Sequence, residues 1–234
     1  MSSPPLRVFY GGSFDPVHNG HLAIARAARD LLHAEVALVP ARDPPHKDAT
    51  HADADQRAQL LALAIEGEPG LRVDPRELHR AGPSYTFDTL TELRAEAGPG
   101  APLAWLVGAD SVLQLHTWHR WRELFDLAHI VAVQRPDARL DAARLREQAP
   151  QVLAQINGRW LPPDALAEGP AGGFLLLPLA QLRPESSTEL RRRIAAGEPW
   201  REWVPAAVAA RIDSLHLYRN PAVILPAFPS SDRP

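Results

Sequence analysis

The sequence predicts an α/β fold of the doubly wound type, in which a mostly parallel sheet carries helices on both faces. Short apolar runs rich in branched residues alternate with longer segments whose apolar residues recur at helical spacing. The first of these runs also ends in a glycine-rich turn that leads directly into a helical pattern. Since ligands of such folds bind at the carboxyl ends of the strands, residues that follow strands are the candidates for a functional site.

The first strand–helix–strand unit is at the N-terminus. Leu6–Tyr10 is a short apolar run and is predicted to be a buried strand. Helical spacing then predicts a helix that starts near Asn19 or Gly20 and ends around His33. Glu35–Pro40 follows as a second strand, and the crossover between the two strands is expected to be right-handed.

The same alternation continues along the chain. Asp53 or Asp55 can cap a helix of leucine-rich sequence, and Ser84 can cap another. A last amphipathic helix is predicted from Val204, Val208, Ile212 and Leu215. The remaining predicted strands are Leu71–Asp74, Leu103–Val107, His129–Val133 and Phe174–Leu177.

The length of 234 residues suits a single α/β domain, which we assign to residues 1–219. Residues 136–172 are rich in Pro, Ala and Arg and are predicted to form a surface insertion with one helix over Asp141–Asn157. The Pro- and Ser-rich residues 220–234 have little apolar surface to pack and are expected to be disordered.

Composition excludes several classes of protein. Without cysteine the chain has no disulfide, no thiolate metal site and no Cys nucleophile. It shows neither a signal peptide nor an apolar stretch near the roughly 20 residues of a membrane span, so a cytoplasmic protein is expected. A net charge of −3, with 25 basic and 28 acidic residues interspersed, offers no basic face for a nucleic-acid polymer. The sequence is compatible with a homo-oligomer.

Residues Gly11–His21, which read GGSFDPVHNGH, predict a phosphate-binding loop. Gly11 and Gly12 permit close backbone approach and positive φ, Pro16 stiffens the turn, and Gly20 lets the next helix start tightly. Backbone N–H groups at that helix start would point at an anion, which the helix dipole also favours.

His18 and His21 are three residues apart at the start of the same helix. Both imidazoles can therefore project to one side and donate to one phosphate. In nucleotidyl transfer the developing charge is on non-bridging oxygens, where fixed donors are most effective. As an alternative, two histidines at this spacing could hold a metal, but the sequence shows no third ligand at suitable spacing.

The loop resembles the HxGH signature of the nucleotidyltransferase α/β-phosphodiester superfamily, whose members transfer a nucleoside monophosphate and release pyrophosphate. Downstream, Pro184–Arg193 (PESSTELRRR) resembles the second signature, ISSTxIRxR, with Glu185 in place of the usual apolar residue. Here Ser187 or Thr188 can cap a helix, and Arg191 can reach the same phosphates one turn later. The resemblance implies catalytic roles for His18, His21 and Arg191. It implies ATP contacts for Gly11, Gly12, Ser13, Phe14, His18, Gly20, His21, Ser187, Thr188 and Arg191.

Within the superfamily the chain most resembles the bacterial nicotinate-mononucleotide adenylyltransferases. The PSYT segment that ends in Tyr85 and Thr86 resembles the part that seats the mononucleotide, and Asp110 resembles the aspartate of a GxD motif that contacts the ribose. Trp118 resembles the aromatic residue that stacks on the nicotinate ring. A PPHK segment and an RP segment resemble parts of the family that border the site. The resemblance implies that the mononucleotide-binding residues are Ser13, Tyr85, Thr86, Asp110, Trp118, Arg135, His46 and Lys47.

The resemblance implies a Rossmann-like enzyme of NAD biosynthesis that joins ATP and nicotinate mononucleotide to give deamido-NAD and pyrophosphate. Mg²⁺ is expected to be held mainly by the ATP phosphates, without a dedicated protein metal site. Alternatives are a pantetheine-phosphate adenylyltransferase, a cytidylyltransferase or a non-catalytic nucleotide sensor on the same fold. Ser13 is typical of the pantetheine-phosphate branch, but that branch carries TxGH where this chain has His18. A sensor would not need both His18 and His21.

Overall fold

The computed structural model describes residues 4–42, 50–78, 80, 82–134, 140–179 and 183–219. Its centre is a six-stranded parallel sheet of order β3-β2-β1-β4-β5-β6. The predicted doubly wound α/β fold is confirmed, and each predicted strand is found within two residues of its expected ends. The strands are β1 (Arg7–Gly12), β2 (Val36–Pro40), β3 (Leu71–Val73), β4 (Leu103–Gly108), β5 (His129–Gln134) and β6 (Phe174–Pro178).

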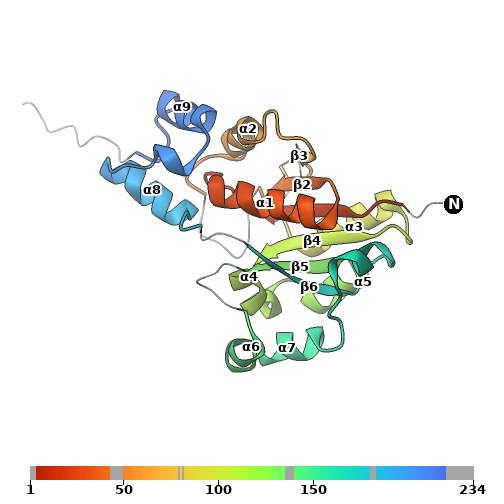
Figure 1. Cartoon of the computed structure of the whole chain (residues 1–234). Coiled ribbons are helices and arrows are strands. Elements are labelled where there is room, and N and C mark those ends of the chain that lie inside the picture. Colours follow the sequence, from red (N-terminus) through yellow and green to blue (C-terminus); the bar gives the residue numbers. More distant parts are fainter. Residues whose placement is uncertain are drawn as a thin grey trace, which may run out of the picture.

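Helices cover both faces of the sheet (Figure 1). One face carries α1 (Asn19–Leu32), α2 (Ala54–Ala64), α8 (Ser187–Ala196) and α9 (Ala206–Ser214). The other carries α3 (Thr86–Ala97), α4 (Ala109–Leu113), α5 (Leu124–Leu127), α6 (Ala142–Gln148) and α7 (Pro150–Ile156). Short 3-10 helices lie at Leu115–Thr117, Trp121–Glu123, Pro163–Ala167 and Arg201–Trp203.

The strand sequences are apolar on both sides because each face of the sheet forms part of a separate core. In β1, Val8 and Tyr10 point into the core beneath α1, whereas Phe9 points into the opposite core beneath α3. This burial on two faces explains why the strands are continuous apolar runs rather than alternating ones.

Strand order places the expected ligand site between β1 and β4. The chain runs from β1 outward to β3 on one side and from β4 outward to β6 on the other. At this switch point the connections after neighbouring strands diverge and leave a crevice at their carboxyl ends. Gly12 ends β1 and Gly108 ends β4, so both glycines border that crevice.

The described part of the predicted insertion, residues 140–172, differs from the prediction of a surface insertion with one helix. The helix is divided into α6 and α7 because Pro150 disfavours helical geometry at Ala149, whose φ is −148°. Leu145, Val152 and Ile156 are fully buried in the core beneath the sheet. The segment is therefore part of the packed fold as well as of its surface.

Two further boundaries differ from expectation or remain predictions. The last helix starts at Ala206 with Pro205 as its N-cap, so Val204 packs from outside the helix. Residues 220–234, predicted to be disordered, lie outside the described residues.

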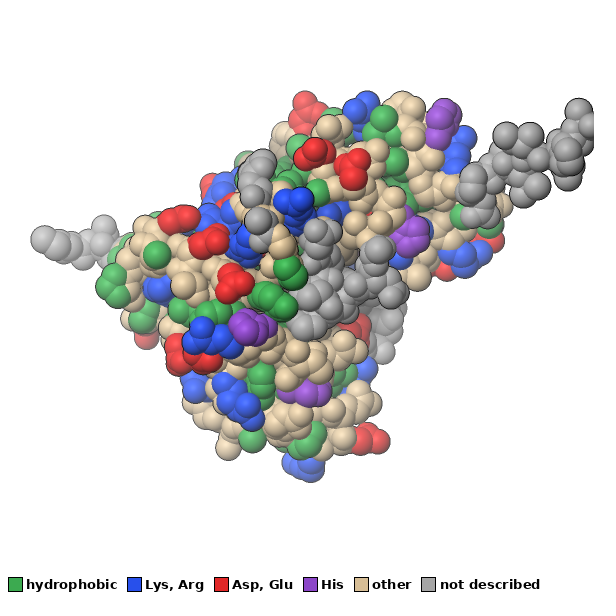
Figure 2. All heavy atoms as spheres, turned by 180° about the vertical axis from the view of Figure 1, so that it is seen from behind, with side chains coloured by type: hydrophobic (Ala, Val, Ile, Leu, Met, Phe, Trp, Pro, Cys, Tyr) green, Lys and Arg blue, Asp and Glu red, His purple; other side chains and the backbone are tan. Residues whose placement is uncertain are grey.

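The surface view shows acidic and basic side chains interspersed over one face, without separation by sign (Figure 2). Over the part of the chain that the structure describes, we find no helix with the length and apolar character of a membrane span.

Candidate active site

The loop from β1 to α1 packs tightly against aromatic rings. A Cβ atom on Gly11 would lie 2.2 Å from the ring of Trp105, and one on Gly12 would lie 3.0 Å from the ring of Phe14. Gly11 therefore has no room for a side chain, and a side chain at Gly12 would require the Phe14 ring to shift, so both glycines permit close approach, here of aromatic rings. The predicted positive φ is not found at either of them, since Phe14 adopts the left-handed geometry instead, with φ 46°.

His18 and His21 face the same side of the start of α1, as predicted. Their rings stack, with centroids 3.7 Å apart and planes 29° apart. His18 is the N-cap residue of α1, and its backbone N–H donates to Nδ1 of His21 at 3.3 Å. A ring nitrogen that accepts this bond carries no proton, so the neutral ring of His21 has its proton on Nε2. That N–H is a donor suited to a phosphate oxygen.

The second motif contacts the first, although its helix cap differs from the prediction. Ser186, and neither Ser187 nor Thr188, caps α8, because its Oγ accepts the N–H of Glu189 at 3.2 Å. Thr188 is exposed. Ser187 Oγ instead donates to the carbonyl of Pro16 at 3.0 Å, so the start of α8 is hydrogen-bonded to the phosphate loop.

Arg191 also reaches the loop. Its Nη1 donates to the carbonyl oxygen of Asp15 at 2.6 Å. The two signatures, far apart in sequence, are therefore joined by direct hydrogen bonds, and Arg191 lies beside the loop that carries the histidine pair.

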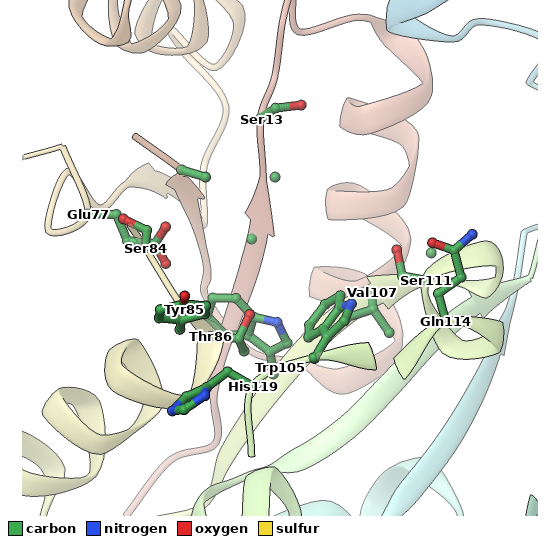
Figure 3. A pocket seen from close by; sticks show the side chains of 15 residues that line it. Ser13, Glu77, Ser84, Tyr85, Thr86, Trp105, Val107, Ser111, Gln114 and His119 are labelled. Atoms are coloured by element: carbon green, nitrogen blue, oxygen red, sulfur yellow. The ribbon is translucent and has the colours of Figure 1, made fainter. Parts of the chain in front are cut away.

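A pocket opens beside this loop at the carboxyl ends of β1 and β4 (Figure 3). Four residues predicted to bind the mononucleotide line it together: Ser13, Tyr85, Thr86 and Trp118. Figure 3 shows Tyr85 and Thr86 on one wall, and Ser111 and Gln114 on the opposite side. The other lining residues are Gly11, Gly12, Ala41, Glu77, Ser84, Trp105, Val107, Gly108 and His119.

Not every predicted residue is brought to the pocket. Asp110 follows β4 directly but does not line the pocket, and its side chain is 71% exposed with Arg144 Nη2 3.7 Å away. Its neighbours Gly108 and Ser111 do line it. His46, Lys47 and Arg135 lie outside the described residues, so their assignments stay predictions.

Buried polar groups of the pocket were missed by the sequence analysis. Ser84 was predicted to cap α3, but that helix begins one residue later, with Tyr85 as N-cap and no side-chain cap. Within the described residues, Ser84 Oγ and Trp105 Nε1 are buried without a hydrogen-bond partner. Unpaired buried donors are costly unless a ligand or water satisfies them, which makes both groups candidates for ligand contacts.

Glu77 is a third buried polar group of the pocket. Thr89 Oγ1 donates to its Oε1 at 2.7 Å, and Arg80 Nη1 donates to Thr89 Oγ1 at 2.9 Å. Burial raises the pKa of the Glu77 carboxyl. In the sequence Glu77 stands among charged and polar residues after a strand, so no pattern singled it out.

The described residues contain no group of three or more His, Asp or Glu side chains able to hold a metal ion. Asp15, the carboxylate within the phosphate loop, has both oxygens engaged by hydrogen-bond donors from His51, Ala52 and Tyr218. The histidine pair and Arg191 supply donors beside the loop, which suit phosphate oxygens.

The comparisons with known proteins agree with this geometry. The sequence profile of the cytidylyltransferase-like family matches residues 9–193. A protein of Stenotrophomonas maltophilia (strain K279a) named "Probable nicotinate-nucleotide adenylyltransferase" is 53% identical over 92% of this chain and 98% of its own length. A Chromohalobacter salexigens protein of the same name is 44% identical over 92% of this chain and 96% of its own.

Solved structures share the fold. The Plasmodium falciparum nicotinic acid mononucleotide adenylyltransferase complexed with NaAD superposes with a TM-score of 0.70 at 16% identity, over 92% of this chain and 97% of that one. The same enzyme complexed with APC gives a TM-score of 0.68. At this identity the likeness shows the fold alone, whereas the profile and the curated relatives show the family. This chain belongs to the nicotinate-nucleotide adenylyltransferase family of cytidylyltransferase-like proteins.

Proposed function

We propose that this protein transfers AMP from ATP to nicotinate mononucleotide, giving deamido-NAD and pyrophosphate in NAD biosynthesis. The names of its relatives support this reaction, and one observation of the site is the main structural argument for it. The stacked pair His18 and His21, Arg191 and the pocket lined by Tyr85 and Trp118 all meet around a single loop. Such a site can hold the phosphates of one nucleotide next to the ring of another.

In this reaction a 5′-phosphate oxygen of the mononucleotide attacks the α-phosphorus of ATP. The new P–O bond forms as the bond from the α-phosphorus to the bridging oxygen breaks, and pyrophosphate leaves. No covalent enzyme intermediate is required. The protein's contribution is to align two polyanions and to offset their repulsion.

The roles of individual residues follow from their donors. His21 offers Nε2–H, and His18 stacks beside it at the positive end of α1, where non-bridging oxygens are stabilised. Nε and Nη2 of Arg191 make no hydrogen bond to the described residues and can bind phosphate oxygens. Ser13, Tyr85, Thr86 and Trp118 would hold the mononucleotide, and the ring of Trp118 would stack on its base.

Mg²⁺ would be carried mainly by the ATP phosphate oxygens, because the described residues supply donors rather than a carboxylate cage. The ion would offset charge on the phosphates. Asp15 is not proposed as its ligand, since both of its carboxylate oxygens accept hydrogen bonds within the protein.

The direct test measures pyrophosphate release from ATP with a panel of acceptors: nicotinate mononucleotide, nicotinamide mononucleotide, phosphopantetheine and choline phosphate, the last also with CTP. We expect turnover with nicotinate mononucleotide to exceed that with every other acceptor. Preference for phosphopantetheine or choline phosphate would assign another branch of the superfamily. Nucleotide binding without turnover would assign a sensor.

A further inference from the structure

We propose that Asp15 is a positioning residue that couples Arg191 and the C-terminal turn at Tyr218 to the phosphate loop, and thereby aligns Arg191 for the triphosphate. The identity of that nucleotide rests on the proposed function. Asp15 lies in the middle of the loop and is only 3% exposed. It therefore acts on its neighbours in the protein.

Asp15 accepts hydrogen bonds from segments that are remote in sequence. Its Oδ2 accepts the backbone N–H of His51 at 2.8 Å, and its Oδ1 accepts that of Ala52 at 3.2 Å. Oδ1 also accepts the hydroxyl of Tyr218 at 2.8 Å, across 203 residues. Arg191 Nη1 bonds the Asp15 carbonyl at 2.6 Å and lies 3.8 Å from its Oδ2.

A carboxylate is an unexpected group in a phosphate-binding loop, because its charge repels the ligand. Here donors and the Arg191 guanidinium surround the carboxylate and offset its charge locally. In return, the backbone carbonyl of Asp15 accepts a hydrogen bond from Nη1 of Arg191, and the carboxylate forms an ion pair with the same nitrogen. Since the guanidinium is planar and rigid, holding one nitrogen limits the directions in which Nε and Nη2 point.

Tyr218 lies in a defined turn near the end of the described chain. Its φ is 62°, a left-handed geometry that costs energy for a bulky residue. Leu217 N–H donates to the carbonyl of Ile212 at 3.1 Å, which fixes the turn to α9. The partly buried Tyr218 packs against the core beneath α1, so its hydroxyl is held at Asp15. The geometry thus connects the end of the fold to the alignment of Arg191.

The test is a double-mutant cycle on ATP binding. Tyr218→Phe removes one hydroxyl and keeps the ring. We expect it to weaken binding of an α,β-methylene ATP analogue, measured by calorimetry, by about fivefold. The KM for nicotinate mononucleotide should not change. If Tyr218 acts through Arg191, the same change in an Arg191→Lys background should cost much less, since the two losses are not additive.

Ser214→Ala is the matched control, because its hydroxyl, also near the C-terminus, donates only to the carbonyl of Arg211 at 2.9 Å. It should leave ATP binding unchanged. A purely structural role predicts that Tyr218→Phe lowers Tm but binds the analogue like wild type well below the transition. That result, or additive losses in the cycle, would overturn the proposal.

Asp15→Asn is a second test of the proposal, for use if Tyr218→Phe does not fold well. It keeps the shape but replaces one acceptor oxygen by an amide donor, so we expect at least a comparable loss of analogue binding. Unchanged binding in this folded variant would also overturn the proposal. Absence of turnover by wild type with every acceptor would contradict only the proposed function, since the binding titration still tests the alignment of Arg191.

Discussion

The backbone N–H of His18 donates to Nδ1 of His21 at 3.3 Å, while the two rings stack 3.7 Å apart. This bond places the proton of the neutral His21 ring on Nε2. His21 can therefore donate to a phosphate without first taking up a proton, so the orientation of the donor is set by the first turn of α1 itself.

His21→Asn separates the two functions of this side chain. The amide oxygen of Asn can replace Nδ1 as acceptor of the His18 N–H, but it leaves no donor at the position of Nε2. We expect Tm to stay close to wild type and kcat to fall about 10²-fold or more. His21→Gln, which can place an N–H near Nε2, should recover part of kcat. Equal kcat for wild type and His21→Asn would remove His21 from the mechanism.

His18→Asn tests the other member of the pair. Asn is among the preferred N-cap residues, so α1 should still start at the same place. Loss of the imidazole should lower kcat by about 10²-fold or more if His18 stabilises charge in the transition state. Single-turnover rates together with thermal melting give the answer. A variant with unchanged kcat would show that His18 only packs beneath its partner.

Trp118→Ala tests the acceptor half of the site. Because Trp118 lines the pocket with Tyr85, its loss should raise the KM for nicotinate mononucleotide by about two- to tenfold, the range of an aromatic pair. ATP binding should be spared. Trp160→Ala is a control, since Trp160 is 49% exposed and contacts Phe174 away from the pocket. If Trp118→Ala weakened ATP binding and left the KM for nicotinate mononucleotide unchanged, Trp118 would belong to the ATP half of the site.

Trp105→Phe removes the indole N–H and keeps an aromatic ring against Gly11. Because Nε1 is buried without a partner among the described residues, loss of the N–H itself should cost no stability, and any fall in Tm should come only from the smaller ring. If the N–H donates to the mononucleotide, KM should rise about fivefold. Trp200→Phe is a control for a buried indole on the opposite face of the sheet. A fall in Tm larger than that of Trp200→Phe, without a change in KM, would show that Nε1 serves only the folded protein.

The strands and the phosphate loop could be predicted because their signals are local. Strands buried on both faces read as apolar runs, and the glycine-rich turn is recognisable within a few residues, although the Trp105 ring that packs on Gly11 comes from a distant strand. The cap of α8 could not be predicted, since Ser186, Ser187 and Thr188 are chemically equivalent candidates in sequence. Backbone geometry selects Ser186 and leaves Ser187 to bind the Pro16 carbonyl.

Contacts between segments that are far apart in the chain could not be predicted from the sequence. Asp15 stood inside a recognised motif, but its partner Tyr218 is 203 residues away and carries no motif. Trp105 read as an apolar strand residue, because a sequence does not show which side chains of a strand reach its carboxyl-end pocket. The acceptor pocket is therefore the part of the site that depended most on the folded structure.

Stability should depend on pH through His129. Its Nδ1 accepts the N–H of Gly173 and its Nε2 donates to the carbonyl of Gly169, each at 2.9 Å, so the ring is held neutral. Burial lowers the pKa of His129 below its ordinary value of about 6.5. As the pH falls below that value, the unfolded chain takes up a proton that the folded protein excludes, so the folded state loses stability.

We therefore expect the free energy of unfolding to decrease between about pH 7.5 and about pH 5.5, and Tm to fall by about 2–4 °C for each kcal/mol of that decrease. His129→Gln should be less stable at the higher pH but should show a smaller decrease across this range, because the proton-linked penalty is gone. His33→Asn is the control, since His33 is exposed and Asn accepts its left-handed φ of 48°. It should keep the wild-type dependence. The same slope in His129→Gln as in wild type would assign the pH dependence to other groups.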